Sequence, residues 1–201
     1  MIHAVIFDFG NVLCTFEIQH FLRRVSRHSK KSLPELQQLL PTFKDVGVQY
    51  ESGVITSDGF FEEVRQRAAL SIDKDEFIKA YCEIFTPIPS MFDLVRRLKR
   101  NYKLGLISNT NEWHYQYGIR PVAVFPLFDA VSLSFEVKAM KPARPIYDNM
   151  LAKLIVNPPE CVYIDDIEEN VDVAVALGMH GAHFSTPDKL VQSLRALDLV
   201  F

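Results

Sequence analysis

Carboxylate, hydroxyl, amide and ammonium side chains follow short apolar runs at four places in this chain. The four places are Asp8, Ser108 with Asn109, Lys141, and Asp165 with Asp166. Carboxylates together with a backbone carbonyl are hard oxygen ligands of the kind that Mg²⁺ prefers. Neutral donors and a lysine cation are suited to the oxygens of a transferring phosphoryl group. These residue types therefore indicate phosphoryl-transfer chemistry at a magnesium site.

The first apolar run, Ala4 to Phe7, ends directly at Asp8. A continuous run of this kind predicts a buried parallel strand. A carboxylate at the end of such a strand is costly unless it binds something, so we expect Asp8 to be functional. It is placed to attack phosphorus and form an aspartyl-phosphate. We expect Gly10 to use its backbone freedom for a tight turn that brings its carbonyl close to a ligand.

Strand and helix patterns alternate after residue 87. The expected strands cover residues 104–107, 130–133, 161–164 and 181–184, and the expected helices cover residues 91–98, 146–154, 171–177 and 190–197. This alternation predicts an α/β fold, a doubly wound, Rossmann-like parallel sheet with helices on both faces. Ligands bind such sheets beyond the carboxyl ends of the strands, where the strand order reverses. The four polar places are therefore expected to converge at one edge.

The stretch between the first strand and residue 87 has helical spacing instead. Ser32 and either Thr56 or Ser57 are expected to cap helices, with Pro34 in the first turn of the helix after Ser32. A further helix is expected from Asp73 to Phe85. The predicted organisation is a core formed by residues 1–15 and 87–201 with a small α-helical insertion at residues 16–86.

The overall composition is that of an ordinary globular protein. The chain has 201 residues, of which 48% are hydrophobic and 23% charged, and its net charge is −3. This charge offers no broad attraction to nucleic acid. The sequence shows no secretory signal and no apolar run long enough to span a membrane. Its three cysteines form no close pair, which favours a reducing compartment. We expect a cytoplasmic protein without a membrane or nucleic-acid partner.

Four stretches, in order, resemble the motifs of the haloacid dehalogenase-like hydrolase superfamily. They are residues 7–13, 107–109, 141–142 and 163–166. The insertion is similar to the cap domain of that superfamily. Residues 50–61, 141–147 and 176–179 also resemble the subgroup that contains sugar-phosphate phosphatases and the N-terminal domain of soluble epoxide hydrolase.

The resemblance implies a role for each motif residue. Asp8 would be the nucleophile and Lys141 the catalytic cation, while Ser108, Asn109 and Lys141 would bind the phosphate. Asp8, the Gly10 carbonyl, Asp166 and Asp165 would hold Mg²⁺. The implied function is a magnesium-dependent phosphatase for a small phosphorylated metabolite, for example a sugar phosphate, that works through an aspartyl-phosphate.

One position departs from the pattern of the superfamily. Its phosphatases usually carry a second aspartate two residues after the nucleophile as the general acid and base, and here that residue is Gly10. Such a group is worth about 10² to 10⁴ in rate. A phosphatase without it would act on esters whose leaving oxygen needs little protonation, such as an anomeric sugar phosphate or an acyl phosphate. Otherwise it would borrow an acid from the insertion, for which His20 and His28 are candidates.

Two other interpretations stay open at this point. A 2-haloacid dehalogenase also lacks the second aspartate, but the adjacent carboxylates Asp165 and Asp166 would then repel each other without a cation. A catalytically silent member would bind a phosphorylated ligand or a protein partner. We favour the phosphatase because the carboxylates and Lys141 are all present.

Overall fold

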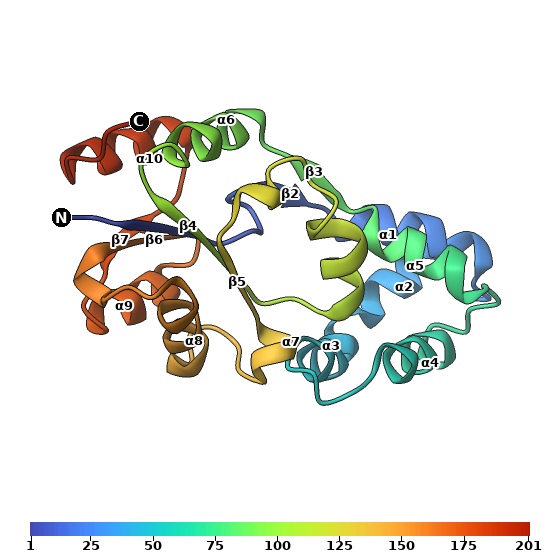
Figure 1. Cartoon of the computed structure of the whole chain (residues 1–201). Helices are drawn as coiled ribbons and strands as arrows, with labels where there is room; N and C mark the ends of the chain where they lie inside the picture. The colour runs from blue at the N-terminus through green and yellow to red at the C-terminus, as the bar shows by residue number, and fades with distance from the viewer.

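A five-stranded, entirely parallel sheet runs through one half of the molecule, with the strands in the order β5-β4-β1-β6-β7 (Figure 1). The computed structural model describes residues 1–201. The strands of this sheet are β1 (Ala4–Phe7), β4 (Lys103–Ser108), β5 (Ala130–Leu133), β6 (Cys161–Asp165) and β7 (His180–His183). The predicted strands are thus confirmed, to within a residue or so at their ends.

Both faces of the sheet are covered by helices, so the predicted doubly wound fold is confirmed (Figure 1). Alternate residues of β1 point to opposite faces. Val5 and Phe7 belong to an apolar cluster with α6 (Pro89–Leu98) and α10 (Pro187–Ala196). Ala4 and Ile6 belong to a second cluster with α8 (Arg144–Leu154) and α9 (Glu168–Ala176). This two-sided burial explains why β1 is apolar throughout.

The central position of β1 decides where the site lies. From β1 the chain passes to β4 and β5 on one side of the sheet, and it then returns to β6 and β7 on the other side. The strand order therefore reverses at β1. Asp8 follows β1 directly, and its backbone N–H donates to the Ile164 carbonyl at 2.8 Å. The carboxyl end of β1 is the expected location of a ligand in such a sheet.

Five helices form the insertion, which lies beyond this edge of the sheet (Figure 1). They are α1 (Ile18–Val25), α2 (Leu33–Leu39), α3 (Lys44–Glu51), α4 (Ser57–Arg67) and α5 (Lys74–Cys82). Ser32 and Glu35 form a capping box at the start of α2, and Pro34 lies in its first turn. Thr56 and Asp73 cap α4 and α5 by accepting hydrogen bonds from backbone N–H groups. The predicted helix starts are confirmed.

A short antiparallel ribbon, β2 (Cys14–Phe16) with β3 (Phe85–Pro87), joins the insertion to the core. The sequence showed no sign of it, because three residues are too few for a strand pattern. The prediction of a helix reaching Phe85 is wrong. The helix α5 ends at Cys82, and Phe85 pairs with Phe16 in this ribbon, whose strands are too short to show a pattern in the sequence. The ribbon lies where we predicted the domain boundaries, and the division at 15/16 and 86/87 stays a prediction.

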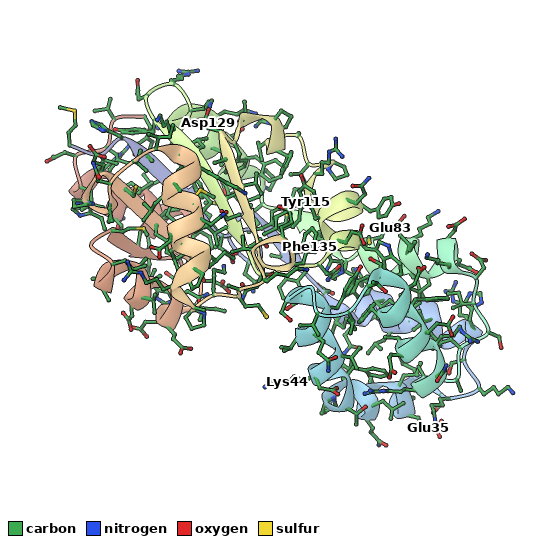
Figure 2. All side chains as sticks on the ribbon, turned by 60° about the horizontal axis from the view of Figure 1, so that its bottom comes forward. Glu35, Lys44, Glu83, Tyr115, Asp129 and Phe135 are labelled. Atoms are coloured by element: carbon green, nitrogen blue, oxygen red, sulfur yellow. The ribbon has the colours of Figure 1, made fainter.

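The insertion has an apolar core of its own, to which the large core also contributes. Its cluster of 18 buried residues includes Trp113, which lies beyond β4 in the sequence. Near this junction, α7 (Ser134–Val137) contacts α3. Figure 2 shows the two halves side by side, with Tyr115 and Phe135 labelled close to where they meet. None of the helices combines the length and apolar composition needed to cross a bilayer.

Candidate active site

A cavity of about 350 Å³ lies between the carboxyl edge of the sheet and the insertion. Six of the seven residues predicted for the site line it: Asp8, Gly10, Ser108, Asn109, Lys141 and Asp166. The seventh, Asp165, is fully buried and bonds to Lys141. The fold therefore brings the four distant stretches together, as expected from the ends of parallel strands.

Lys141 lies between two buried carboxylates. Its Nζ is 2.6 Å from Asp8 Oδ1 and 2.7 Å from Asp165 Oδ2. Burial disfavours the charge of Lys141, but the two carboxylates outweigh burial and raise its pKa above the usual value. Burial also raises the pKa of Asp8 to about 6, although Lys141 opposes this shift. Lys141 binds Oδ1 of Asp8 and not Oδ2, so the pair leaves the second oxygen of this carboxylate to react.

Asp165 is held by protein donors on both of its oxygens. Oδ1 accepts from the Ile167 backbone N–H at 2.9 Å, and the Asn170 amide reaches both oxygens at 3.1 and 3.2 Å. The Tyr163 hydroxyl and the Lys141 ammonium group also donate hydrogen bonds to Oδ2. Asp165 therefore orients Lys141. Its role as a direct metal ligand stays a prediction.

The turn after Asp8 differs from the prediction in one respect. We expected Gly10 to adopt the special backbone angles, but the left-handed residue is Asn11, with φ of 53°. Asparagine tolerates this conformation better than most residues. The turn lets Asn11 Nδ2 donate to Asp166 Oδ2 at 3.0 Å, so it links the first and last motifs. Nothing in the sequence distinguished Asn11 as a positioning residue.

The oxygen ligands at this edge of the sheet suit a divalent cation. Oxygens of Asp8, Asp165 and Asp166 lie within 4.8 Å of one another. The Gly10 carbonyl lines the same cavity and accepts no hydrogen bond from the chain. Three carboxylates against the single ammonium of Lys141 leave an excess of negative charge, which a hard cation bound by oxygen ligands would neutralise.

The hydrogen-bond donors at the end of β4 differ from those that we expect from the sequence. The Asn109 side chain is fully used: its Oδ1 accepts from the Lys141 backbone N–H at 2.7 Å, and its Nδ2 donates to the Lys141 carbonyl at 3.0 Å. The backbone N–H of Asn109 and the hydroxyl of Ser108 have no partner in the chain. These two groups are the available donors, and the Asn109 side chain instead fixes the backbone that carries Lys141.

The insertion supplies the other wall of the cavity, and the sequence did not predict these residues. Its titratable groups are Glu51 and Tyr81, and the Tyr81 ring stacks on His114 of the core. Its apolar lining consists mainly of Phe16, Ile18, Ile84 and Phe85. A leaving group in this cavity would contact mostly apolar side chains. Only the folding of the insertion onto the sheet reveals this wall.

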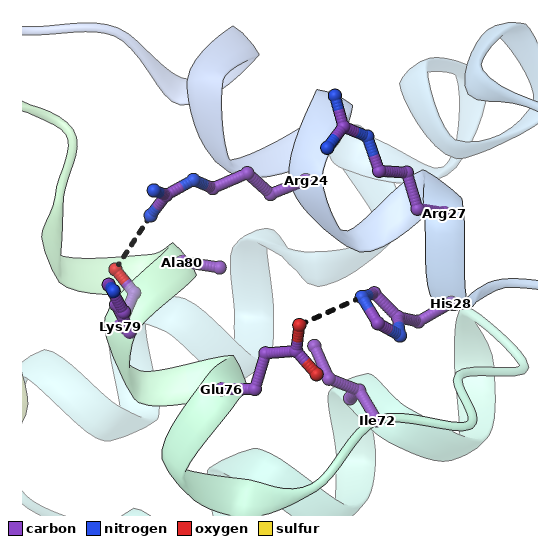
Figure 3. A pocket seen from close by; sticks show the side chains of 7 residues that line it. All are labelled: Arg24, Arg27, His28, Ile72, Glu76, Lys79 and Ala80. Atoms are coloured by element: carbon purple, nitrogen blue, oxygen red, sulfur yellow. Dashed lines mark hydrogen bonds and ion pairs between the residues drawn. The ribbon is translucent and has the colours of Figure 1, made fainter.

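The two histidines proposed as substitute acids lie elsewhere. His20 is exposed and pairs with Glu17 at 3.3 Å. His28 lines a separate cavity of about 210 Å³ on the insertion, where it pairs with Glu76 at 3.1 Å (Figure 3). Neither lines the catalytic cavity, so neither candidate is placed to replace the missing acid.

Comparison with known families agrees with this geometry. A family model described as haloacid dehalogenase-like hydrolase matches residues 2–178. The chain belongs to the haloacid dehalogenase-like hydrolase family. The match spans all four motifs, and it includes the insertion as well as the core.

The chain is also similar to two curated enzymes. D-ribitol-5-phosphate phosphatase of Bacteroides thetaiotaomicron is 24% identical and aligns over 89% of both chains. Pyrimidine 5′-nucleotidase YjjG of Escherichia coli is 29% identical and aligns over 73% of this chain and 69% of its own. A solved family enzyme from B. thetaiotaomicron, in complex with magnesium and inorganic phosphate, is 24% identical. It superposes with a TM-score of 0.79 over 92% of this chain and 95% of its own.

Proposed function

We propose that this chain is a magnesium-dependent phosphatase that hydrolyses a small phosphorylated metabolite through an aspartyl-phosphate on Asp8. The observation that carries the proposal is the arrangement around Asp8: one oxygen is held by Lys141, and the other is free beside the Gly10 carbonyl and the Asp166 carboxylate. The phosphatase relatives support this choice, as does the family structure with magnesium and phosphate.

The metal would be held by Asp8, the Gly10 carbonyl and Asp166. When bound, Mg²⁺ would supply positive charge that draws the phosphoryl group to Asp8 and neutralises its oxygens. Asn11 would keep the Asp166 carboxylate in place, since it donates to Oδ2 at 3.0 Å. Asp165 would contribute negative charge and hold Lys141.

The protein groups act on the phosphoryl group in two stages. In the first, the free oxygen of Asp8 attacks phosphorus, and the bond from phosphorus to the ester oxygen breaks. Lys141, the Ser108 hydroxyl and the Asn109 backbone N–H stabilise the charge on the transferring group. In the second, water attacks the aspartyl-phosphate and releases inorganic phosphate, which regenerates the Asp8 carboxylate.

The direct test measures phosphate release from a panel of phosphorylated metabolites by the purified protein, with Mg²⁺ and with a chelator. We expect turnover of at least one member only with Mg²⁺, and none by Asp8→Asn. Halide release from 2-haloacids without metal would instead identify a dehalogenase. Binding of phosphorylated ligands without any turnover would identify a silent member. Either of these two results would overturn the proposal.

A further inference from the structure

Proton transfer is the step for which the proposed mechanism has no residue, because Gly10 stands where family phosphatases usually carry the acid. The cavity contains six titratable side chains: Asp8, Glu51, Tyr81, His114, Lys141 and Asp166. Asp8 and Lys141 form the nucleophile pair, and Asp166 belongs to the proposed metal site. The remaining three groups are the candidates for moving a proton.

His114 does not fit this role. The Asn111 side-chain amide donates to its Nδ1 at 3.1 Å, so its proton is on Nε2, which donates to the Tyr81 carbonyl at 3.1 Å. Both ring nitrogens are therefore occupied. Burial lowers the pKa of His114 to about 4, so the ring is neutral near pH 7. Tyr81 is excluded for the opposite reason, because burial raises the pKa of its hydroxyl well above the usual value.

Glu51 differs from both of these residues. It is the last residue of α3 and lines the cavity, and its carboxyl group forms no hydrogen bond or ion pair in the chain. Burial alone raises its pKa to about 7, with no neighbouring charge contributing. A group that titrates near the working pH can both donate and accept a proton.

The backbone at Glu51 is hydrogen-bonded to the core next to the groups proposed to bind phosphate. The Ser134 hydroxyl lies 2.6 Å from the Glu51 carbonyl and 2.9 Å from both the N–H and the carbonyl oxygen of Thr110. Thr110 directly follows the Ser108–Asn109 donors. The insertion residue is therefore joined through one buried hydroxyl to the loop that binds the transferring group.

A second hydrogen bond holds the turn to the core two residues further along, at Gly53. Lys138 Nζ donates to the Gly53 carbonyl at 2.7 Å. Gly53 has φ of 65°, and a Cβ there would collide with the Phe135 carbonyl oxygen and Lys138 Nζ. The turn thus lies flat against the segment around Phe135, labelled in Figure 2. Because the turn is held at both Glu51 and Gly53, the backbone that carries Glu51 has a defined position at the wall of the cavity.

We propose that Glu51 is the general acid and base of this active site, supplied by the insertion in place of the residue that Gly10 lacks. This inference rests on the proposed phosphatase function. Protonated Glu51 gives its proton to the ester oxygen as the bond from phosphorus to oxygen breaks. The resulting carboxylate takes a proton from the water that attacks the aspartyl-phosphate, so the cycle ends with Glu51 protonated again and no net proton lost.

The experiment compares wild type with Glu51→Gln on two kinds of substrate, in the presence of Mg²⁺. For an alkyl phosphate, whose alkoxide is a poor leaving group, we expect kcat to fall by about 10² to 10⁴. For p-nitrophenyl phosphate, whose leaving group needs no proton, the burst that phosphorylates Asp8 should keep its rate within about threefold. Steady turnover after the burst should still slow, because the base is gone.

Two variants separate a chemical role from a structural one. Glu51→Asp retains the carboxyl group and should recover part of the lost rate, and Glu62→Gln removes an exposed carboxylate of the same insertion and should change nothing. With alkyl phosphates, the wild-type rate should decline above about pH 7, where Glu51 loses its proton. The pH profile of Glu51→Gln should not show this decline. Thermal unfolding verifies that each variant is folded.

The outcomes distinguish this inference from the proposed function. If wild type turns over and Glu51→Gln matches it within about threefold on alkyl phosphates with the same pH profile, Glu51 is not the acid and only this inference falls. An equal loss with both substrates, including the burst, would mean a positioning role and would also overturn it. If wild type releases no phosphate with Mg²⁺, both proposals fall together.

Discussion

The Lys141 ammonium group lies 2.6 Å from Asp8 Oδ1 in a buried pair whose members are 133 residues apart in the sequence. Lys141 also binds Asp165 Oδ2 at 2.7 Å. The Lys141 ammonium group thus fixes the positions of the Asp8 and Asp165 carboxylates relative to each other. Because a buried charge is costly without its partner, this arrangement leads to predictions for stability as well as for activity.

Asp8→Asn should abolish phosphatase activity, by at least about 10³-fold, because an amide oxygen cannot form the aspartyl-phosphate. The fold should survive, since the side chain keeps its shape and Asp165 still neutralises Lys141. Phosphate release and thermal unfolding measure the two effects. Full turnover by this variant would remove Asp8 from the mechanism.

Lys141→Met should lower the free energy of unfolding by about 3–5 kcal/mol, because it leaves the buried Asp8 and Asp165 carboxylates without their cation. Mg²⁺ should restore part of this loss by binding the uncompensated carboxylates. Chemical denaturation with and without Mg²⁺ tests both points. The matched control is Lys44→Met, which removes an exposed lysine that forms no ion pair (labelled in Figure 2). An equal change in the two variants would contradict the role of the buried pair.

Gly10→Asp should restore activity to Glu51→Gln, by at least about tenfold on alkyl phosphates, because it places an acid where family phosphatases have one. There is room for the side chain, since the nearest atom to a Cβ at position 10 is in the Phe16 ring at 3.4 Å. In the wild-type background the gain should be small, because Glu51 already supplies the proton. Steady-state kinetics on alkyl phosphates and p-nitrophenyl phosphate in both backgrounds measures these effects. A failure of Gly10→Asp to raise the activity of Glu51→Gln on alkyl phosphates would argue against a missing acid in that variant.

The partly buried carboxyl group of Glu51 should make stability depend on pH. Burial raises its pKa from the usual 4.5 to about 7, so the folded state binds the proton more tightly than the unfolded state. Wild type should therefore lose stability relative to Glu51→Gln as the pH rises from about 4.5 to 7, by at most about 3 kcal/mol in all. Urea denaturation of both proteins at pH 4.5 and pH 8, without metal, measures the difference. A constant difference across this range would show that Glu51 has an ordinary pKa.

Gly53→Ala should move the turn that carries Glu51 away from the core. Its φ of 65° strains alanine, and the new methyl group would meet the Phe135 carbonyl oxygen. We expect a loss of about 1–3 kcal/mol in stability and a larger drop in activity on alkyl phosphates than on p-nitrophenyl phosphate.

Gly47→Ala is the matched control for Gly53→Ala. Gly47 lies inside α3 with no atom within 4 Å of a Cβ, and this variant should gain about 0.5–1 kcal/mol. Thermal unfolding and kinetics of both variants test the prediction. If Gly53→Ala behaved like Gly47→Ala, the turn would not depend on this close contact.

The sequence was sufficient for the core of the fold and for most of the site. Apolar runs such as Ala4 to Phe7 are buried on both faces, and such continuous runs predict parallel strands. Once the strands are parallel, their carboxyl ends share one edge, so the meeting of Asp8, Lys141 and Asp166 follows from topology alone. Capping signals such as Thr56 were also readable because they act within one turn of a helix.

The tertiary structure alone decided how the two walls of the cavity face each other. Glu51 looked like any acidic residue at a helix end, and its elevated pKa arises from burial against elements far away in the sequence. His28 looked equally available, yet the packing of the insertion directs it to another cavity. Asn109 looked like a phosphate ligand, but its amide holds the Lys141 backbone. Local patterns report which residues a strand or helix contains, whereas desolvation and hydrogen-bond partners depend on which surfaces meet after the chain has folded.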